Sequence, residues 1–329
     1  MIRFFRQSYI IQYIVIAIIA IAIWVPSFIS GNVDVVWRSP VMPLYNLFAD
    51  LLDFWPPAML LFAFLLMAFN TMFFNSILTT NQLVGKVSSM GALMYLLLMN
   101  LLPNQTTFYP FLLASVFLLM FVHTLFMIYQ APRPELYLLN AGFYLSFASM
   151  CYFPSLVLVI WGIIALGIIH RGSFRLHLIP FIGLLLPYFF YFSVHFLMGD
   201  LLEVLGRYAA YFQGFQLTLQ GFNRLNTIVL AFLLLACAMP LLSPHIYAFE
   251  KSIAVRTKTV MTVVLLFFGI FMLFVDGDPI QSGVMFIPLA ILFSYEGSYL
   301  EKLRWPNITF IVFLLLVLTS HYLPLFQQP

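Results

Sequence analysis

Few side chains in this sequence can do chemistry, and several of them lie inside long apolar runs. His123, His195, Asn70 and Asn75 are the clearest examples. A histidine in such a run can bind a ligand or carry a proton, and an asparagine can hydrogen-bond a neighbouring helix. Bonding between helices is the commoner role for both. No chain of acidic or basic residues accompanies them, which disfavours ion-coupled transport.

The cysteines and the basic residues exclude several other kinds of site. Cys151 and Cys237 both lie in apolar segments, and no Cys/His spacing resembles a metal site. We therefore predict no disulfide framework, no metal centre and no bound cofactor, while the participation of a divalent metal ion stays open. The fourteen basic residues form no continuous patch, so nucleic acid is not a predicted partner.

The composition places most of the chain in lipid. Of 329 residues, 64% are hydrophobic and only 8% are charged, whereas an ordinary soluble domain has about 25% charged residues. Because the shortage of charge extends along the whole chain, a soluble protein with a single anchor is excluded. The sequence predicts one all-α membrane domain over residues 1–329, a polytopic bundle with membrane lipids as its surroundings.

Apolar runs separated by polar, Gly or Pro residues predict about eleven transmembrane helices, with ten to twelve as the range. The predicted spans are 9–29, 57–78, 87–102, 108–129, 136–152, 154–169, 178–198, 225–242, 260–275, 284–293 and 308–325. The first span follows Arg3 and Arg6 and lacks a small-residue cleavage site, so we interpret it as a retained helix.

The basic residues predict the orientation of the bundle. With a cytoplasmic N-terminus, eleven basic residues fall inside, and only Arg38, Arg207 and Arg224 fall outside. Seven of the eleven acidic residues fall on the outer side. This distribution is typical of a bacterial inner-membrane protein with its C-terminus in the periplasm.

Two long outer loops, residues 30–56 and 199–224, carry the pattern of amphipathic helices. In the first, Val41, Tyr45, Phe48, Leu52 and Trp55 recur at spacings of four, three, four and three. The second has a similar apolar stripe, and on its polar side Glu203 and Arg207 form a pair one helical turn apart. Both segments are predicted to lie at the membrane interface, where they either cover the bundle or face a substrate.

The order of these elements resembles two groups of proteins. The quoted segments are residues 81–87 (NQLVGKV), Leu102-Pro103, residues 140–149 (NAGFYLSFAS), the Tyr152-Phe153-Pro154 break, His170-Arg171 and residues 183–188 (GLLLPY). They resemble a family of bacterial polytopic inner-membrane proteins of unassigned function. More loosely, residues 1–198 resemble the N-terminal module of the GT-C superfamily of glycosyltransferases, followed by the outer loop 199–224 and the C-terminal helices 225–329.

The GT-C resemblance implies transfer of a sugar from a polyprenyl-phosphate lipid on the outer face. By position, it makes Asp34 the catalytic base, and Arg38, Arg207 and Arg224 ligands of the lipid phosphate. Asp50 and Asp53 are accessory candidates. The sequence departs from the pattern because Asp34 stands between two valines with no acidic neighbour. A solvated Asp34, or its ion pair with Arg38, is the alternative.

Two other functions stay open. One is a non-catalytic subunit with a GT-C-like scaffold in a cell-envelope or secretion assembly, with other membrane proteins as its partners. The other is a transporter of lipids or small molecules.

Overall fold

The computed structural model describes residues 2–7, 9–30, 38–84, 88–102, 105–129, 131–169, 174–213, 252–276, 283–299 and 304–327. Within these ranges the chain is all-helical and contains no strand. The helices are α1 Ile2–Phe5, α2 Ile10–Ser30, α3 Pro43–Leu52, α4 Pro56–Thr80, α5 Met90–Met99, α6 Pro110–Ile128, α7 Pro134–Cys151, η2 Phe153–Val157, α8 Leu158–Ile168, α9 Phe174–Met198, α10 Leu201–Gln213, α12 Ile253–Asp276, η3 Gly283–Met285, α13 Phe286–Tyr299 and α14 Arg304–Gln327.

Five of the described helices are long and apolar enough to cross a membrane, so the chain is a multi-pass membrane protein. These spans are Ile10–Ser30, Pro56–Thr80, Pro110–Ile128, Arg175–Met198 and Ile253–Met272. Shorter apolar helices occupy Met90–Met99, Phe153–Ile168 and Pro306–Tyr322. Ten of the eleven predicted spans coincide with helices, and the one at 225–242 lies outside the described residues. The total of eleven crossings stays a prediction.

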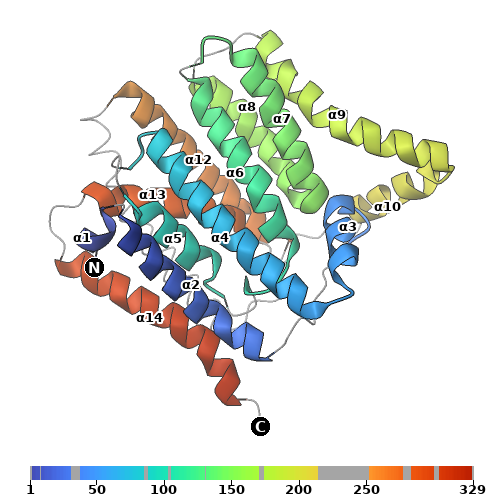
Figure 1. Ribbon diagram of the computed structural model, residues 1–329. Helices are drawn as coiled ribbons and strands as arrows, with labels where there is room; N and C mark the ends of the chain where they lie inside the picture. The colour runs from blue at the N-terminus through green and yellow to red at the C-terminus, as the bar shows by residue number, and fades with distance from the viewer. Residues whose placement is uncertain are drawn as a thin grey trace.

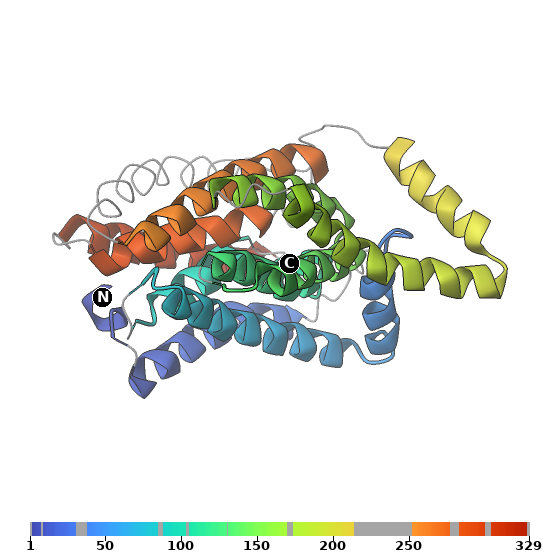
Figure 2. The same cartoon turned by 90° about the horizontal axis from the view of Figure 1, so that it is seen from above.

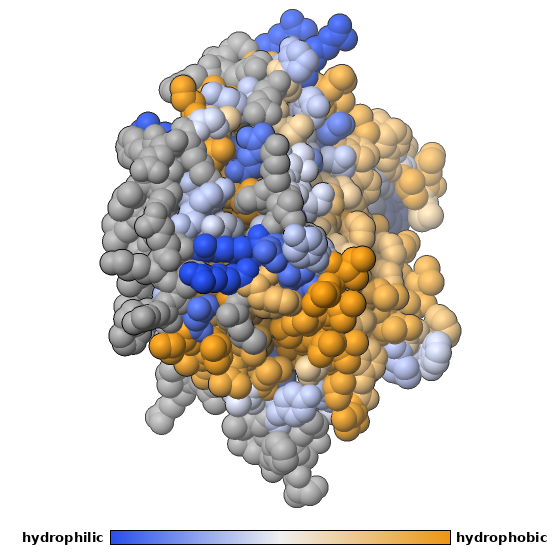
Figure 3. Space-filling view, turned by 60° about the vertical axis from the view of Figure 1, so that its left-hand side comes forward, coloured by the Kyte–Doolittle hydropathy of each residue, from blue (hydrophilic) through white to orange (hydrophobic). Residues whose placement is uncertain are grey.

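The helices pack side by side along a common direction, which gives the bundle two ends (Figures 1 and 2). We call the end that carries α1 the α1 end, and the opposite one, which carries α3 and α10, the α3 end. Figure 3 turns the side with α1 toward the viewer and shows hydrophilic residues gathered next to a broad apolar surface. An apolar flank beside a polar end is the surface that a lipid bilayer requires.

Helix α5 lies at the centre of the bundle, and all ten of its residues are buried. Ten residues rise about 15 Å, half of a hydrocarbon core of about 30 Å, so the ends of α5 need partners from protein. At its start the Ala92 N–H donates to Oδ1 of Asn75, 3.2 Å away, on α4. The Asn75 amide in turn donates to the Ser88 carbonyl and the Tyr13 hydroxyl, each at 3.0 Å.

Two other helices supply hydrogen-bond partners at the last turn of α5. Trp24 on α2 donates its ring N–H to Oδ1 of Asn100, at 3.0 Å. His321 on α14 lies with Nε2 2.7 Å from the Asn100 carbonyl oxygen. These bonds join α2, α5 and α14 at the α3 end, so segments from both termini depend on one buried helix.

Helices α7 and α9 meet through two glycines. A Cβ on Gly142 would lie 1.9 Å from the Pro180 carbonyl oxygen, and one on Gly183 would lie 2.1 Å from the Leu139 carbonyl oxygen. Neither position has room for a side chain. Small residues at membrane helix interfaces allow such close backbone approach. Beyond this contact α9 diverges from the bundle and leads to α10 (Figures 1 and 2).

Replacing Asn75 with leucine tests the role of the α5 cap. Asn75→Leu is expected to lower the free energy of unfolding by about 1–3 kcal/mol, because the Ala92 N–H loses its acceptor inside the bundle. Steric trapping in bicelles measures this quantity. The control is Ser76→Leu, at an exposed position of the same helix, and is expected to change it by less than about 0.5 kcal/mol. Equal effects of both substitutions would contradict the cap.

A second prediction concerns the glycine contact. Gly142→Ala is expected to destabilise the protein by about 1–3 kcal/mol, because its methyl group must force α7 and α9 apart. Gly167→Ala on α8 is the control, since no atom lies within 4 Å of its Cβ position. There alanine is expected to be neutral or to stabilise by up to about 1 kcal/mol. Thermal unfolding in detergent ranks the two variants, and a Gly142→Ala protein as stable as the control would contradict this contact.

Candidate functional site

The first polar cluster at the α3 end lies on the amphipathic helix α3. The predicted helix is confirmed. It begins at Pro43, and its buried residues are Tyr45 and Ala49. The Tyr45 hydroxyl donates to the Phe108 carbonyl oxygen at 3.1 Å, which fixes α3 against the start of α6. The face of α3 opposite Tyr45 and Ala49 can therefore carry charged side chains.

Arg38 binds both accessory carboxylates. Its Nη2 lies 3.1 Å from Asp50 and 2.7 Å from Asp53, and all three side chains are more than half exposed. One guanidinium with two carboxylates has a net charge of −1. This cluster therefore attracts a further anion less than a single arginine would. Asp34, the predicted base, lies outside the described residues.

The second cluster lies at the corner between α9 and α10. Gly199 adopts φ +85°, a left-handed conformation that lets the chain turn sharply after α9. Directly after it, Asp200 places its carboxylate 2.9 Å from Nδ1 of His195. The predicted pair of Arg207 and Glu203 is confirmed at 2.6 Å. Its hydrogen bond raises the pKa of Arg207, which stays charged.

Aromatic rings form the floor of this corner. Tyr191 packs edge-on against His195 with ring centroids 4.6 Å apart, and Phe153 and Phe192 both contact the ring of Tyr208. The Tyr208 hydroxyl is buried and lacks a hydrogen-bond partner. Burial raises the pKa of Tyr208, so this hydroxyl stays protonated. An orphaned hydroxyl of this kind is a group that a ligand oxygen can satisfy.

The chemistry available at this corner follows from the atoms left free. When Nδ1 of His195 donates to Asp200, its Nε2 is left as a proton acceptor. Arg207 uses Nη2 for Glu203, which leaves the N–H groups on Nη1 and Nε as anion donors. Arg207 also lies within electrostatic reach of Asp200 and Tyr191. The corner therefore combines a proton acceptor with a cation.

The structure joins some of the predicted site residues and separates others. Arg38 is brought together with Asp50 and Asp53 on α3, and Arg207 lies on α10 with its own carboxylate. No ion pair joins the two clusters within the described ranges. Arg224, like Asp34, lies outside those ranges, so the shared phosphate site stays a prediction.

The polar residues inside the spans mostly bond neighbouring helices. Asn70 donates to Ser115 at 2.8 Å, and Asn75 and His321 cap the ends of α5. His123 is different, because its Nδ1 lies 3.1 Å from the Asn81 amide and its ring is within electrostatic reach of Lys258.

Lys258 is a residue whose role the sequence analysis missed. The predicted topology makes it one of the eleven cytoplasmic basic residues, and the structure buries it on α12, where it is only 3% exposed. The spacing of its neighbours on the helix could have indicated that Lys258 is buried. Val255, Thr259 and Thr262 are buried on the same helix at offsets of three, one and four from Lys258, which is the pattern of an inward face.

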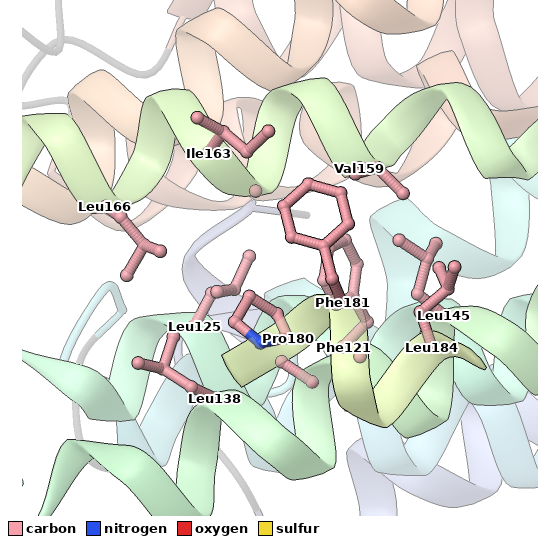
Figure 4. Close-up of a pocket in the computed structure, with 13 residues that line it drawn as sticks. Phe121, Leu125, Leu138, Leu145, Val159, Ile163, Leu166, Pro180, Phe181 and Leu184 are labelled. Atoms are coloured by element: carbon pink, nitrogen blue, oxygen red, sulfur yellow. The ribbon is translucent and has the colours of Figure 1, made fainter. Parts of the chain in front are cut away.

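An apolar crevice lies between α6, α7, α8 and α9 (Figure 4). The crevice is shallow, and all thirteen lining residues are apolar or glycine. Phe121, Leu138, Ile163 and Leu184 represent the four helices. Such a lining can contact a lipid chain at the surface of the bundle and offers no hydrogen-bonding group to a polar solute.

No cluster of three or more metal-binding side chains occurs in the described part of the chain. Comparison with protein-family models, curated proteins and solved structures finds no match. Function is therefore inferred from the site itself.

The orphaned hydroxyl gives a paired test. Tyr208→Phe is expected to leave the free energy of unfolding unchanged or to raise it by up to about 1 kcal/mol, because the lost hydroxyl has no partner. Tyr188→Phe, in the same aromatic cluster, removes a 2.8 Å bond to Ser149 and is expected to cost about 0.5–1.5 kcal/mol. Urea titration in detergent compares them. A larger loss for Tyr208→Phe would show that this hydroxyl is bonded within the protein.

Proposed function

We propose that the protein is a GT-C-like glycosyltransferase that uses a polyprenyl-phosphate-linked sugar at the outer face of a bacterial inner membrane. The observation that carries the proposal is the α9–α10 corner, where the His195–Asp200 pair lies beside Arg207. Support also comes from the apolar lining of the crevice, which is compatible with contact to a lipid chain, and from the two amphipathic helices at the α3 end.

The reaction needs one proton acceptor and one anion site. An acceptor hydroxyl attacks the anomeric carbon of the sugar, its proton passes to a base, and the bond to the lipid phosphate breaks with both electrons on the phosphate oxygen. Asp34 is the base implied by the GT-C resemblance. His195, held by Asp200, is a second candidate proton acceptor.

The arginines differ in their suitability as phosphate ligands. Arg38 already serves two carboxylates, whereas Arg207 serves one and keeps its remaining N–H groups free. We therefore propose Arg207 as the main ligand among the described arginines, with Arg224 as a further candidate. Arg38 is expected to contribute less, because two carboxylates already bind its guanidinium directly.

Binding of undecaprenyl phosphate to the purified chain tests this ranking. Arg207→Gln is expected to weaken binding by roughly tenfold, the loss that follows from removing a charged hydrogen bond. Arg38→Gln is expected to weaken it less. Native mass spectrometry measures the bound fraction.

Arg133→Gln is the control, because it removes one exposed positive charge at the opposite end of the bundle. Unchanged binding in Arg207→Gln, or an equal loss in the control, would refute the phosphate role.

A non-catalytic subunit is the second candidate, and the α9–α10 arm favours it. This arm diverges from the bundle (Figure 2) and exposes Leu197 and Leu202 at 84% and 85%. A partner helix can cover such a surface as well as lipid can. Full complementation by both Asp34→Asn and His195→Gln, together with stable co-purification of another membrane protein, would favour this function over catalysis.

A further inference from the structure

Among the described residues, a buried cation at the α1 end, Lys258, has no carboxylate partner. Lys258 is 3% exposed, and within the described part of the chain its hydrogen-bond partner is the Asn81 carbonyl oxygen, 3.4 Å from Nζ. No carboxylate among the described residues lies within 4 Å of it. An uncompensated ammonium in an apolar interior is strongly unfavourable, so this site calls for an anion.

The neighbours of Lys258 supply the other contacts that a phosphate group would need. The Asn81 amide donates to Nδ1 of His123, at 3.1 Å, which makes that nitrogen an acceptor and leaves the Nε2–H as a donor. Oδ1 of Asn81 is buried and has no partner. The three groups therefore offer spare N–H donors together with one unused acceptor.

The local backbone holds this arrangement in place. Asn81 follows the last turn of α4, and Gln82 after it adopts φ +59°, a left-handed conformation that is uncommon for a residue other than glycine. The Leu83 N–H then returns to the Leu78 carbonyl oxygen at 3.0 Å. His123 is only partly buried, so the cluster reaches the molecular surface and a ligand has a way in.

We propose that Lys258, His123 and Asn81 form a binding site for a phosphate-bearing anion that also carries a hydroxyl group. The ammonium and the imidazole N–H would bind phosphate oxygens, and the hydroxyl would donate to Oδ1 of Asn81. Both an anionic lipid headgroup with hydroxyls and hydrogen phosphate have this chemistry. The site is separate from the proposed transferase site, which lies at the opposite end of the bundle.

The test uses the full chain in maltoside micelles that contain no phosphate. Phosphatidylglycerol or inorganic phosphate is added, and thermal unfolding gives an apparent affinity for each probe. Stabilisation by phosphatidylglycerol alone identifies a lipid headgroup, and stabilisation by inorganic phosphate identifies the free ion. Either result supports the site, and stabilisation by neither probe would overturn it.

Variants separate anion binding from a purely structural role. Lys258→Met keeps the size of the side chain and removes its charge, so the unfolding temperature without probe is expected to be unchanged or higher. The response to the probe is expected to weaken by tenfold or more. Arg133→Gln, at the same end but outside the cluster, is expected to respond like the wild type.

A Lys258→Met protein that still responds like the wild type would refute the site. If that variant fails to fold, Asn81→Ala replaces it. Loss of the orphaned acceptor is then expected to weaken the probe response several-fold, and an unchanged response would count against the site.

Discussion

A short helix buried along its whole length must find protein partners for its backbone ends, and this constraint organises the bundle. Helix α5 meets it with Asn75 at one end and with Asn100 and His321 at the other. The space around α5 is correspondingly tight, since a Cβ on Gly91 would lie 2.7 Å from Oδ1 of Asn75. Helices from both termini, α2 and α14, join at its last turn. The need to satisfy the polar groups at one end of α5 thus brings together segments that are remote in the sequence.

Unlike the caps of α5, the α7–α9 contact leaves part of the α3 end outside the packed core. Two glycines bring these helices into backbone contact, but α9 then leaves the bundle and carries the α9–α10 corner with it. The His195–Asp200 pair therefore rests on a helical arm and not on the core around α5. Charged groups on such an arm remain accessible, which suits the binding of a headgroup or a partner more than the sealing of a pathway across the membrane.

Features of local origin were predictable from the sequence. Hydropathy located the helices, the Phe153-Pro154 break separated two of them, and the spacing of Glu203 and Arg207 predicted an ion pair that forms within one helix turn. The partners of Arg38 and of His195 were not predicted, because each depends on how a turn folds between a helix end and the next helix. The burial of Lys258 was missed for a similar reason: a charge at the start of a helix looks solvated until neighbouring helices cover it.

The two ends of the bundle differ in how their positive charges are neutralised. At the α3 end, the arginines Arg38 and Arg207 are each matched by carboxylates at 3.1 Å or less. At the α1 end, Lys258 is more deeply buried, and among the described residues its partner is a carbonyl oxygen at 3.4 Å. A phosphate must compete with a carboxylate for either arginine, whereas it meets no such competitor among the described residues around Lys258. If the α1 end faces the cytoplasm, as the basic residues predict, Lys258 faces the leaflet that carries anionic lipids, where its uncompensated charge is an advantage.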